Sequence, residues 1–283
     1  MFCRSNELKK KVVITGSTGG LGSEMAKLFL KEGYDLLLLN RSKTKTIQQI
    51  ADFKKQFSDS SIDYLIVDFS KMEEVKNICE KLMTIDFNTI VLNAAIYNVK
   101  VEMMDTNYNN IFQVNFISPY YMLKKLKQKP SIEKFIVIGS VAHKFAKLLE
   151  DDIDYSNHTK INQIYGNSKR FLMFAAYELF KNDNRLLISH PGIVYTNITN
   201  HFHPAINWFI TFWIRLIFPN KKHAAKVLIS KKNKEIPYLY WVGPRIFGLW
   251  GKAGIKKIKK IKNDEIIKIS KIAERIYGEI NED

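Results

Sequence analysis

A glycine-rich segment near the start of the chain constrains the fold more than any other feature. It reads Thr15-Gly16-Ser17-Thr18-Gly19-Gly20-Leu21-Gly22. The apolar run Val12–Ile14 precedes it, and the apolar residues from Leu21 to Phe29 repeat at helical spacing. A strand, a glycine turn and a helix in this order are what a dinucleotide-binding turn requires, since glycine adopts tight turns freely and a helix start attracts phosphate. The segment therefore predicts a pyrophosphate site, with a plain turn as the alternative.

Short apolar runs recur along the chain between stretches of helical periodicity. They cover residues 11–15, 36–39, 64–67, 89–92, 135–138 and 186–189, with a further candidate at 238–242. Continuously apolar runs of this length fit strands buried on both faces, and their alternation with helices predicts right-handed βαβ units. We therefore predict an α/β fold with a Rossmann-type, doubly wound parallel sheet between two helical layers. It forms a single domain with its core at about residues 10–198, and its ligands bind at the carboxyl ends of the strands.

Composition places the chain among intracellular globular proteins. It has 283 residues, of which 46% are hydrophobic, and only two cysteines, Cys3 and Cys79. We expect no disulfide framework and, since few residues precede the first strand, no signal peptide, so a cytoplasmic location is expected. The net charge of +16 fits a lysine-rich composition or contact with an anionic membrane surface. Nucleic-acid binding is not expected, because no reading motif accompanies the charge.

Two segments depart from the alternation of strands and helices. Within residues 199–235, the stretch 206–218 is strongly apolar and aromatic, and it is too short to span a bilayer. It could be a lid over a hydrophobic substrate, an interface in a homo-oligomer, or a helix lying peripherally on a membrane. In the segment 252–283, regularly spaced isoleucines alternate with lysines, which predicts a basic surface helix packed on the core.

The pattern Tyr-x-x-x-Lys at Tyr165 and Lys169 places both side chains on one helical face. A tyrosine, with a pKa of about 10, is a poor acid–base group at neutral pH. A nearby ammonium and a positively charged nicotinamide would lower that pKa. The same spacing of tyrosine and lysine recurs elsewhere in this lysine-rich chain, so the pair is selected by its position in the fold. Tyr165 lies between the strands that end at Ser140 and at Pro191.

Three further polar residues stand where a substrate or cofactor could meet them. Ser140 follows a strand and could donate to a substrate carbonyl, or could simply cap a turn. Asn93 ends the strand 89–92 and could lock its loop or touch the cofactor. Asn115 lies in a helical pattern although asparagine is a poor helix former. It could bond an opened backbone carbonyl or a water molecule.

Together these elements resemble the classical short-chain dehydrogenase/reductase family over about residues 10–200. The matching segments follow the family order: Thr15-Gly16-x-x-x-Gly20-x-Gly22, Asn93-Ala94, Val114-Asn115, Ser140, Tyr165-x-x-Ser168-Lys169 and Pro191-Gly192-Ile-Val-x-Thr196. The spacing of 25 from Ser140 to Tyr165, together with Ser140-Val-Ala-His143 and His190-Pro-Gly, is similar to the retinol-dehydrogenase-like branch. Leu92 and Ala95 depart from the family's Asn-Asn-Ala-Gly, while the four catalytic positions match.

The resemblance implies a role for each matching residue. Tyr165 would be the general acid–base, and Lys169 would lower its pKa and hold the ribose. Ser140 would orient the carbonyl, and Asn115 would support a proton relay through water. Asp68 would bond the adenine and Thr196 the nicotinamide amide. The expected cofactor contacts are Gly16, Ser17, Thr18, Gly20, Leu21, Gly22, Arg41, Asp68, Phe69, Asn93, Ala94, Tyr165, Lys169, Pro191, Gly192, Val194 and Thr196. No metal site is expected.

The end of the second predicted strand indicates the cofactor. A carboxylate there would bond the ribose hydroxyls of NAD and repel a 2′-phosphate. Here the strand ends in Asn40-Arg41, and an arginine offers a planar fork to phosphate. We therefore expect NADP(H) to be favoured over NAD(H), with a solvated loop arginine as the alternative.

These observations predict an oxidoreductase that moves a hydride between NADP(H) and a carbonyl or alcohol. The apolar segment 206–218 suggests a hydrophobic substrate of the lipid, retinoid or steroid kind. Two other functions are weighed against it. A cofactor-sensing interaction protein without turnover would be marked by loss of Tyr165 or Lys169, and both are present. An isomerase or dehydratase using the same pair would need a longer carboxyl-terminal substrate region.

Overall fold

The computed structural model describes residues 9–192, 221–246, 250–258 and 261–282. Within them strands and helices alternate, as the apolar runs predict. The elements are β1 (Lys11–Thr15), α1 (Gly20–Lys31), β2 (Asp35–Asn40), α2 (Lys43–Lys54), β3 (Ile62–Ile66), α3 (Met72–Thr84), β4 (Thr89–Leu92), α4 (Asn110–Phe112), η1 (Gln113–Ile117), α5 (Ser118–Leu126), β5 (Lys134–Ile138), η2 (Val141–Phe145), α6 (Ile161–Leu179), β6 (Leu186–Ser189), α8 (Lys221–Ile229), β7 (Tyr240–Ile246), β8 (Trp250–Lys257) and α9 (Asn263–Glu282).

The strands form one sheet in the order β3-β2-β1-β4-β5-β6-β7-β8. Strands β1 to β7 run parallel, and only β8 pairs antiparallel, with β7. This confirms the predicted Rossmann-type fold and all seven predicted strands. The strand order reverses between β3 and β4, so β1 and β4 lie side by side at the switch point where such sheets bind ligands.

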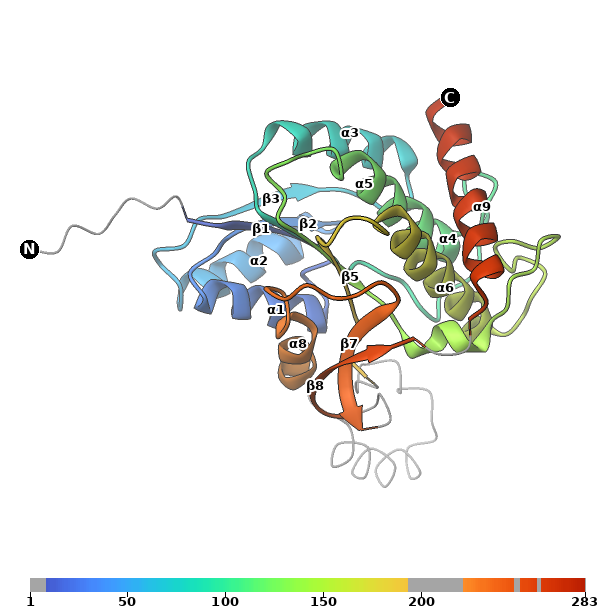
Figure 1. The fold of residues 1–283 in the computed structure, drawn as a ribbon. Coiled ribbons are helices and arrows are strands. Elements are labelled where there is room, and N and C mark those ends of the chain that lie inside the picture. Colours follow the sequence, from blue (N-terminus) through green and yellow to red (C-terminus); the bar gives the residue numbers. More distant parts are fainter. Residues whose placement is uncertain (1–8, 193–220, 247–249, 259–260, 283) are drawn as a thin grey trace, which may run out of the picture.

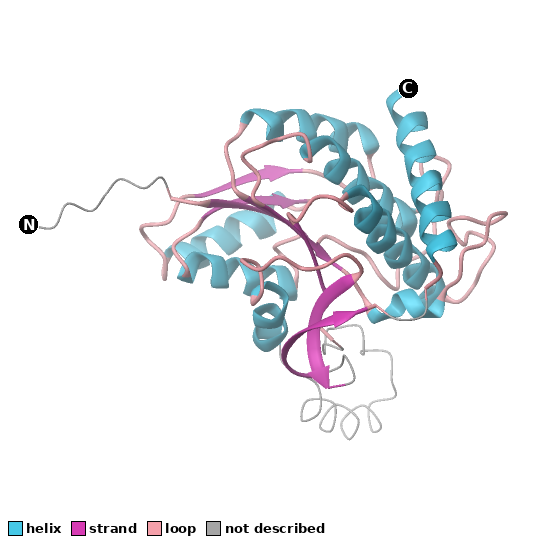
Figure 2. Ribbon diagram, viewed as in Figure 1, coloured by secondary structure: helices cyan, strands magenta, loops and turns pink. Residues whose placement is uncertain are grey.

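Helices cover both faces of the sheet (Figures 1 and 2), with α1, α2 and α8 on one face and α3, α5, α6 and α9 on the other. Successive residues of a strand serve opposite faces. In β1, Val13 belongs to the apolar cluster beneath α3, α5 and α6, while Val12 and Ile14 belong to the cluster beneath α1, α2 and α8. Burial on both faces explains why these strands are continuously apolar.

The carboxyl-terminal region corrects one expectation. The helix predicted over 252–283 is wrong in its first part, because residues up to Lys257 form β8 and α9 begins only at Asn263. Gly251 and Gly254 disfavour a helix there, and Gly251 has a φ of +94°. Nor is α9 basic: it carries five acidic and three basic side chains, and the lysines cluster in β8 and the residues that follow it. Its apolar face packs on the core as expected, through Ile266, Ile269, Ala273, Ile276 and Ile280.

The segment 206–218 lies outside the described residues, so the three alternatives for it stay predictions. Among the helices that the structure does describe, none combines the length and the apolar character needed to cross a bilayer.

Candidate active site

The glycine-rich turn joins β1 to α1 at the switch point of the sheet. Gly16 has a φ of +66°, and a Cβ on it would lie 2.9 Å from the Cα of Ala94. A Cβ on Gly22 would lie 2.4 Å from the backbone oxygen of Gly16. Both positions therefore require glycine, the first for a left-handed turn against the loop after β4 and the second for close packing of α1 on the turn.

A hydrogen-bond cluster from β2 and α2 holds the turn from beneath. The buried Ser17 hydroxyl lies 2.8 Å from Oε1 of Gln49, and Nε2 of Gln49 donates to the Ser17 carbonyl at 2.7 Å. Nδ2 of Asn40 donates to the same hydroxyl at 2.9 Å. The side chain of Ser17 therefore fixes the turn, and only its backbone is left for a cofactor. Sequence reasoning missed Gln49, because nothing in α2 marks it as a partner of the turn.

The amino end of α1 fits the pyrophosphate of a dinucleotide. Its N-cap is Gly19, which offers no side-chain cap, and no acidic residue lies in the first turn. The first helical hydrogen bond is donated by Ser23 to the Gly19 carbonyl. The amides of Gly20, Leu21 and Gly22 thus have no acceptor among the described residues, as is usual at a helix start. Uncapped amides beside an exposed glycine turn are the groups that bind phosphate oxygens.

The loop after β4 is locked to the turn rather than left open. The Thr15 hydroxyl accepts from the amides of Asn93 and Ala94, both at 2.9 Å. The Asn93 side chain donates at 3.0 Å to the carbonyls of Thr15 and Gly16. Of the two roles considered for Asn93, the structure shows loop locking, and cofactor contact stays a prediction for Asn93 and Ala94.

The residues expected around the adenosine lie at the same edge of the sheet. Arg41 follows β2 and is exposed. Asp68 and Phe69 follow β3: Oδ1 of Asp68 accepts from Ser70, and the Phe69 carbonyl accepts from the Ser118 hydroxyl at 2.6 Å. Their contacts with a cofactor stay predictions.

Tyr165, Lys169 and Ser140 come together at the carboxyl end of β5. Tyr165 and Lys169 lie one turn apart on α6. Ser140 heads η2, where its hydroxyl oxygen accepts from the Ala142 amide at 3.2 Å and lies close enough to the Tyr165 phenol to lower the Tyr165 pKa. A Cβ on Gly166 would lie only 2.4 Å from the Ala142 carbonyl. A glycine beside the tyrosine thus lets α6 approach η2 closely. Sequence reasoning missed this role of Gly166.

Burial shifts the pKa of both α6 groups. It raises the pKa of Tyr165 to about 12, opposed in part by the Ser140 hydroxyl, and the ring of Tyr97 packs edge-on at 5.0 Å. It lowers the pKa of Lys169, which is 2% exposed, to about 8. The Lys169 ammonium donates to the Ile138 carbonyl at 3.2 Å and lies 5.8 Å from the Tyr165 ring centre. Desolvation is therefore the largest influence on the Tyr165 pKa, and the lowering of that pKa expected from Lys169 stays a prediction.

Asn115 lies in a turn of π-helix, η1, between α4 and α5. Its Oδ1 accepts from the Ile96 amide at 2.8 Å, and its Nδ2 donates to the Ile96 carbonyl at 2.9 Å and to the Ser168 hydroxyl at 3.2 Å. The expectation that this amide bonds a backbone carbonyl is confirmed, but the carbonyl belongs to the loop after β4. π-Turns concentrate at functional sites, and here the turn ties that loop to α6 one residue before Lys169.

Two buried histidines flank the catalytic edge. Nδ1 of His143 lies 2.7 Å from the Ser140 carbonyl, and Nδ1 of His190 accepts from the Gly192 amide at 3.1 Å. The His190 ring stacks on Trp241 at 3.9 Å. Burial lowers their pKa values, to about 4 for His143 and about 3 for His190. Both are therefore uncharged at neutral pH and hold the strand ends through these contacts.

Pro191 and Gly192 follow β6 at the same edge, and Gly192 has a φ of +81°. The remaining expected contacts, Val194 and Thr196, lie outside the described residues.

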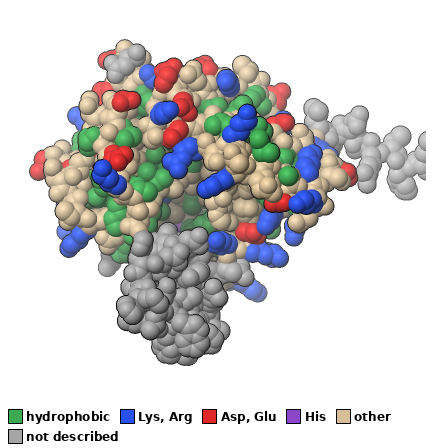
Figure 3. All heavy atoms as spheres, turned by 180° about the vertical axis from the view of Figure 1, so that it is seen from behind, with side chains coloured by type: hydrophobic (Ala, Val, Ile, Leu, Met, Phe, Trp, Pro, Cys, Tyr) green, Lys and Arg blue, Asp and Glu red, His purple; other side chains and the backbone are tan. Residues whose placement is uncertain are grey.

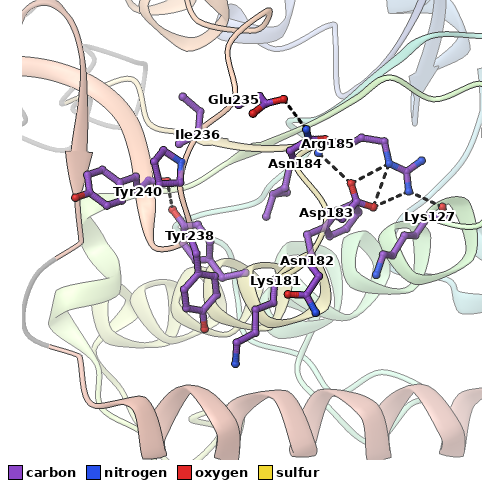
Figure 4. Close-up of a pocket in the computed structure, with 14 residues that line it drawn as sticks. Lys127, Lys181, Asn182, Asp183, Asn184, Arg185, Glu235, Ile236, Tyr238 and Tyr240 are labelled. Atoms are coloured by element: carbon purple, nitrogen blue, oxygen red, sulfur yellow. Dashed lines mark hydrogen bonds and ion pairs between the residues drawn. The ribbon is translucent and has the colours of Figure 1, made fainter.

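A cavity of about 870 Å³ lies away from this site, at the amino ends of β6 and β7 (Figure 4). Two pairs of its polar groups bind each other: Arg185 with Asp183, and Asn184 with Glu235. Figure 3 shows acidic and basic side chains interspersed over the described part of one face of the molecule. Neither feature competes with the carboxyl edge as a reaction site.

Comparisons with known proteins agree with this geometry. A family model described as short chain dehydrogenase matches residues 10–146. WW domain-containing oxidoreductase from Gallus gallus is 23% identical over 207 residues, 69% of this chain and 48% of that protein. Human polyprenol dehydrogenase is 23% identical over 208 residues, 67% of this chain and 62% of that protein. The chain thus spans about half to three-fifths of the length of these relatives.

Solved structures show the same fold. An uncharacterized protein from Mycobacterium Paratuberculosis superposes with a TM-score of 0.72 at 18% identity, covering 96% of this chain and 93% of that one. L-sorbose reductase from Gluconobacter frateurii, solved with NADPH and L-sorbose, gives a TM-score of 0.61 at 18% identity. The match covers 79% of this chain and 89% of that one.

Fold and site together define a dinucleotide-binding Rossmann protein with a Ser–Tyr–Lys arrangement at the switch edge of its sheet. Over residues 10–146 the chain matches the short-chain dehydrogenase family, as the resemblance in its motifs predicts.

Proposed function

We propose that the protein is an NADP(H)-dependent oxidoreductase that interconverts a carbonyl and an alcohol. The observation that carries this proposal is that Ser140, Tyr165 and Lys169 lie together at the same carboxyl edge of the sheet as the uncapped amino end of α1. They come from separate parts of the chain, so their juxtaposition depends on the whole fold.

The bound cofactor supplies the hydride, and this chain's residues place the substrate and move the proton. The Ser140 hydroxyl and the Tyr165 phenol, which lie close together, would both donate to a substrate carbonyl oxygen. Tyr165 would give its proton to that oxygen as the carbonyl is reduced. Because burial raises the pKa of Tyr165 to about 12, the phenol is protonated at neutral pH, which suits the direction of reduction.

The preference for NADP(H) rests on the end of β2. Asn40 is uncharged and turned inward onto Ser17, so no carboxylate there would repel a 2′-phosphate. Arg41 follows it and is exposed, and Lys43 and Lys45 at the start of α2 are exposed as well. This concentration of positive charge favours a phosphorylated ribose.

A hydrophobic substrate is proposed on the sequence of residues 206–218, which follow Thr196 closely and are apolar and aromatic. Two relatives are named for such substrates: polyprenol dehydrogenase and retinol dehydrogenase 14, the latter 22% identical over 216 residues. The membrane-peripheral and homo-oligomeric alternatives for this segment remain open to the same experiment.

The test is NADPH and NADH consumption across aldehydes and ketones of graded chain length, with co-sedimentation on anionic vesicles measured in parallel. We expect turnover with NADPH that rises with chain length. Failure of the wild-type protein to bind or oxidise either cofactor would reject the oxidoreductase. Turnover confined to short polar carbonyls would reject only the hydrophobic substrate.

A further inference from the structure

Lys221, the first residue of α8, lies over the glycine-rich turn. A Cβ built on Gly20 would lie 2.7 Å from Cδ and 2.9 Å from Nζ of Lys221, so the end of the lysine side chain occupies the space beside this glycine. Gly20 is the first residue of α1. The Lys221 ammonium therefore sits at the amino end of α1, beside the amides assigned above to the pyrophosphate.

Apolar packing fixes the position of α8 on α1. Ala225 and Leu228 of α8 share one buried cluster with Met25 and Phe29 of α1. The backbone that carries Lys221 is thus held by the core. Its neighbour Lys222 is exposed, and it offers a matched lysine on the same helix.

The placement is electrostatically unfavourable unless an anion joins it. A helix carries partial positive charge at its amino end, and α1 has neither an acidic residue in its first turn nor a side-chain cap. Within the described part of the chain, no carboxylate pairs with Lys221. Two positive centres side by side, with no anion of the protein between them, indicate a ligand with negative charge.

We propose that Lys221 is a pyrophosphate-binding residue of the cofactor site, acting together with the amides of Gly20, Leu21 and Gly22. This inference rests on the proposed function, and it adds a residue from beyond the segment that carries the family motifs. NADPH and NADH share the pyrophosphate and differ in the 2′-phosphate. Lys221 should therefore contribute equally to both, whereas Arg41 should contribute to NADPH alone.

The experiment compares Lys221→Gln, Lys221→Glu and Lys221→Arg with Lys222→Gln. NADPH and NADH are titrated by fluorescence, and thermal unfolding is followed without cofactor. Losing one charge-assisted hydrogen bond should raise Kd about tenfold for both cofactors in Lys221→Gln. Lys221→Glu should raise it further, while Lys221→Arg and Lys222→Gln stay near wild type. The cofactor-free Tm should hold or increase in Lys221→Gln and Lys221→Glu, because a like charge leaves the helix end.

In Lys221→Gln and Lys221→Glu, cofactor affinity should therefore fall while the cofactor-free Tm holds or rises. A lysine with only a structural role would lower the Tm when it is replaced. Wild-type affinity for both cofactors in Lys221→Gln would overturn the inference, as would a loss confined to NADPH or a decrease in the cofactor-free Tm. In those cases the wild-type protein still binds cofactor and the proposed function stands. A wild-type protein that binds neither cofactor overturns both.

Discussion

The two ends of the carboxyl edge of the sheet are built by opposite means. At the nucleotide end, Gly16 and Gly22 bring backbone close to backbone, and Ser17 and Gln49 only hold the turn. At the catalytic end, burial moves the pKa of Tyr165 up and that of Lys169 down, so both shifts favour uncharged forms. The nucleotide end depends on glycines, whose missing side chains leave room for the backbone and a ligand. The catalytic end buries titratable side chains, which lowers the stability of the folded protein in favour of reactivity.

The largest expected effect tests the catalytic end. Tyr165→Phe removes only the phenol hydroxyl, so turnover should fall by roughly 10²- to 10⁴-fold, while NADPH affinity stays within about twofold because the nucleotide end is untouched. Steady-state kinetics and cofactor titration measure the two. Tyr177→Phe, on the same helix, is the matched control for losing a hydroxyl. Undiminished turnover in Tyr165→Phe would contradict the mechanism.

The stability cost of Lys169 gives the next prediction. Its pKa is about 8 in the folded protein against an ordinary value of 10.5. Below pH 8 the charge is buried at full cost, and from pH 8 to 10.5 the folded protein has released the proton and the cost disappears. Lys169→Met should therefore raise the free energy of unfolding by up to about 3 kcal/mol at pH 7. The gain should vanish above pH 10.5, and turnover should be lost.

Denaturant unfolding as a function of pH measures this effect. The control is Lys129→Met, which should be destabilising at every pH because the buried Lys129 ammonium donates to the carbonyls of Leu82, Met83 and Ile85. A Lys169→Met protein less stable than wild type at pH 7 would show that the Ile138 hydrogen bond outweighs the desolvation.

Two glycine substitutions separate the ends. Gly22→Ala and Gly166→Ala each place a Cβ 2.4 Å from a backbone oxygen, so each should destabilise by about 1–3 kcal/mol. Gly22→Ala should weaken cofactor affinity and spare kcat at saturation, while Gly166→Ala should lower kcat by moving Tyr165 from Ser140. Gly278→Ala, in the open space of α9, should stabilise by about 0.4–1 kcal/mol. If Gly22→Ala and Gly166→Ala changed cofactor affinity and kcat to the same extent, the two ends of the edge would not have separate roles.

The smallest expected effect concerns cofactor choice. Arg41 is exposed, and an exposed ion pair contributes up to about 1 kcal/mol. Arg41→Asp removes that pair and adds repulsion, so the ratio of NADPH to NADH affinity should fall about tenfold in total and approach reversal. Lys43→Asp is the control for charge alone. Equal affinity of the wild-type protein for the two cofactors would show that Arg41 is only a surface residue.

Local sequence pattern predicted the nucleotide end of the sheet well, and the end formed by β7 and β8 less well. β1, β4 and β6 have the predicted bounds, since strands buried on both faces leave an uninterrupted apolar run. β8 was predicted as helix because Ile255, Ile258 and Ile261 repeat at a spacing that helices also use. Two glycines were the available signal against it. Gln49, Gly166 and Lys221 were missed because each acts through a partner distant in sequence, which no local pattern reveals.

Among the residues that the structure describes, β8 is the last strand on the side of the sheet opposite β3. An open edge with unpaired backbone groups is a template for another chain, and lysines along it discourage such pairing. Lys252 and Lys257 of β8 are exposed. Part of the net charge of +16 thus fits a use unrelated to any ligand: positive charge on β8 would discourage other copies of the protein from adding a strand there.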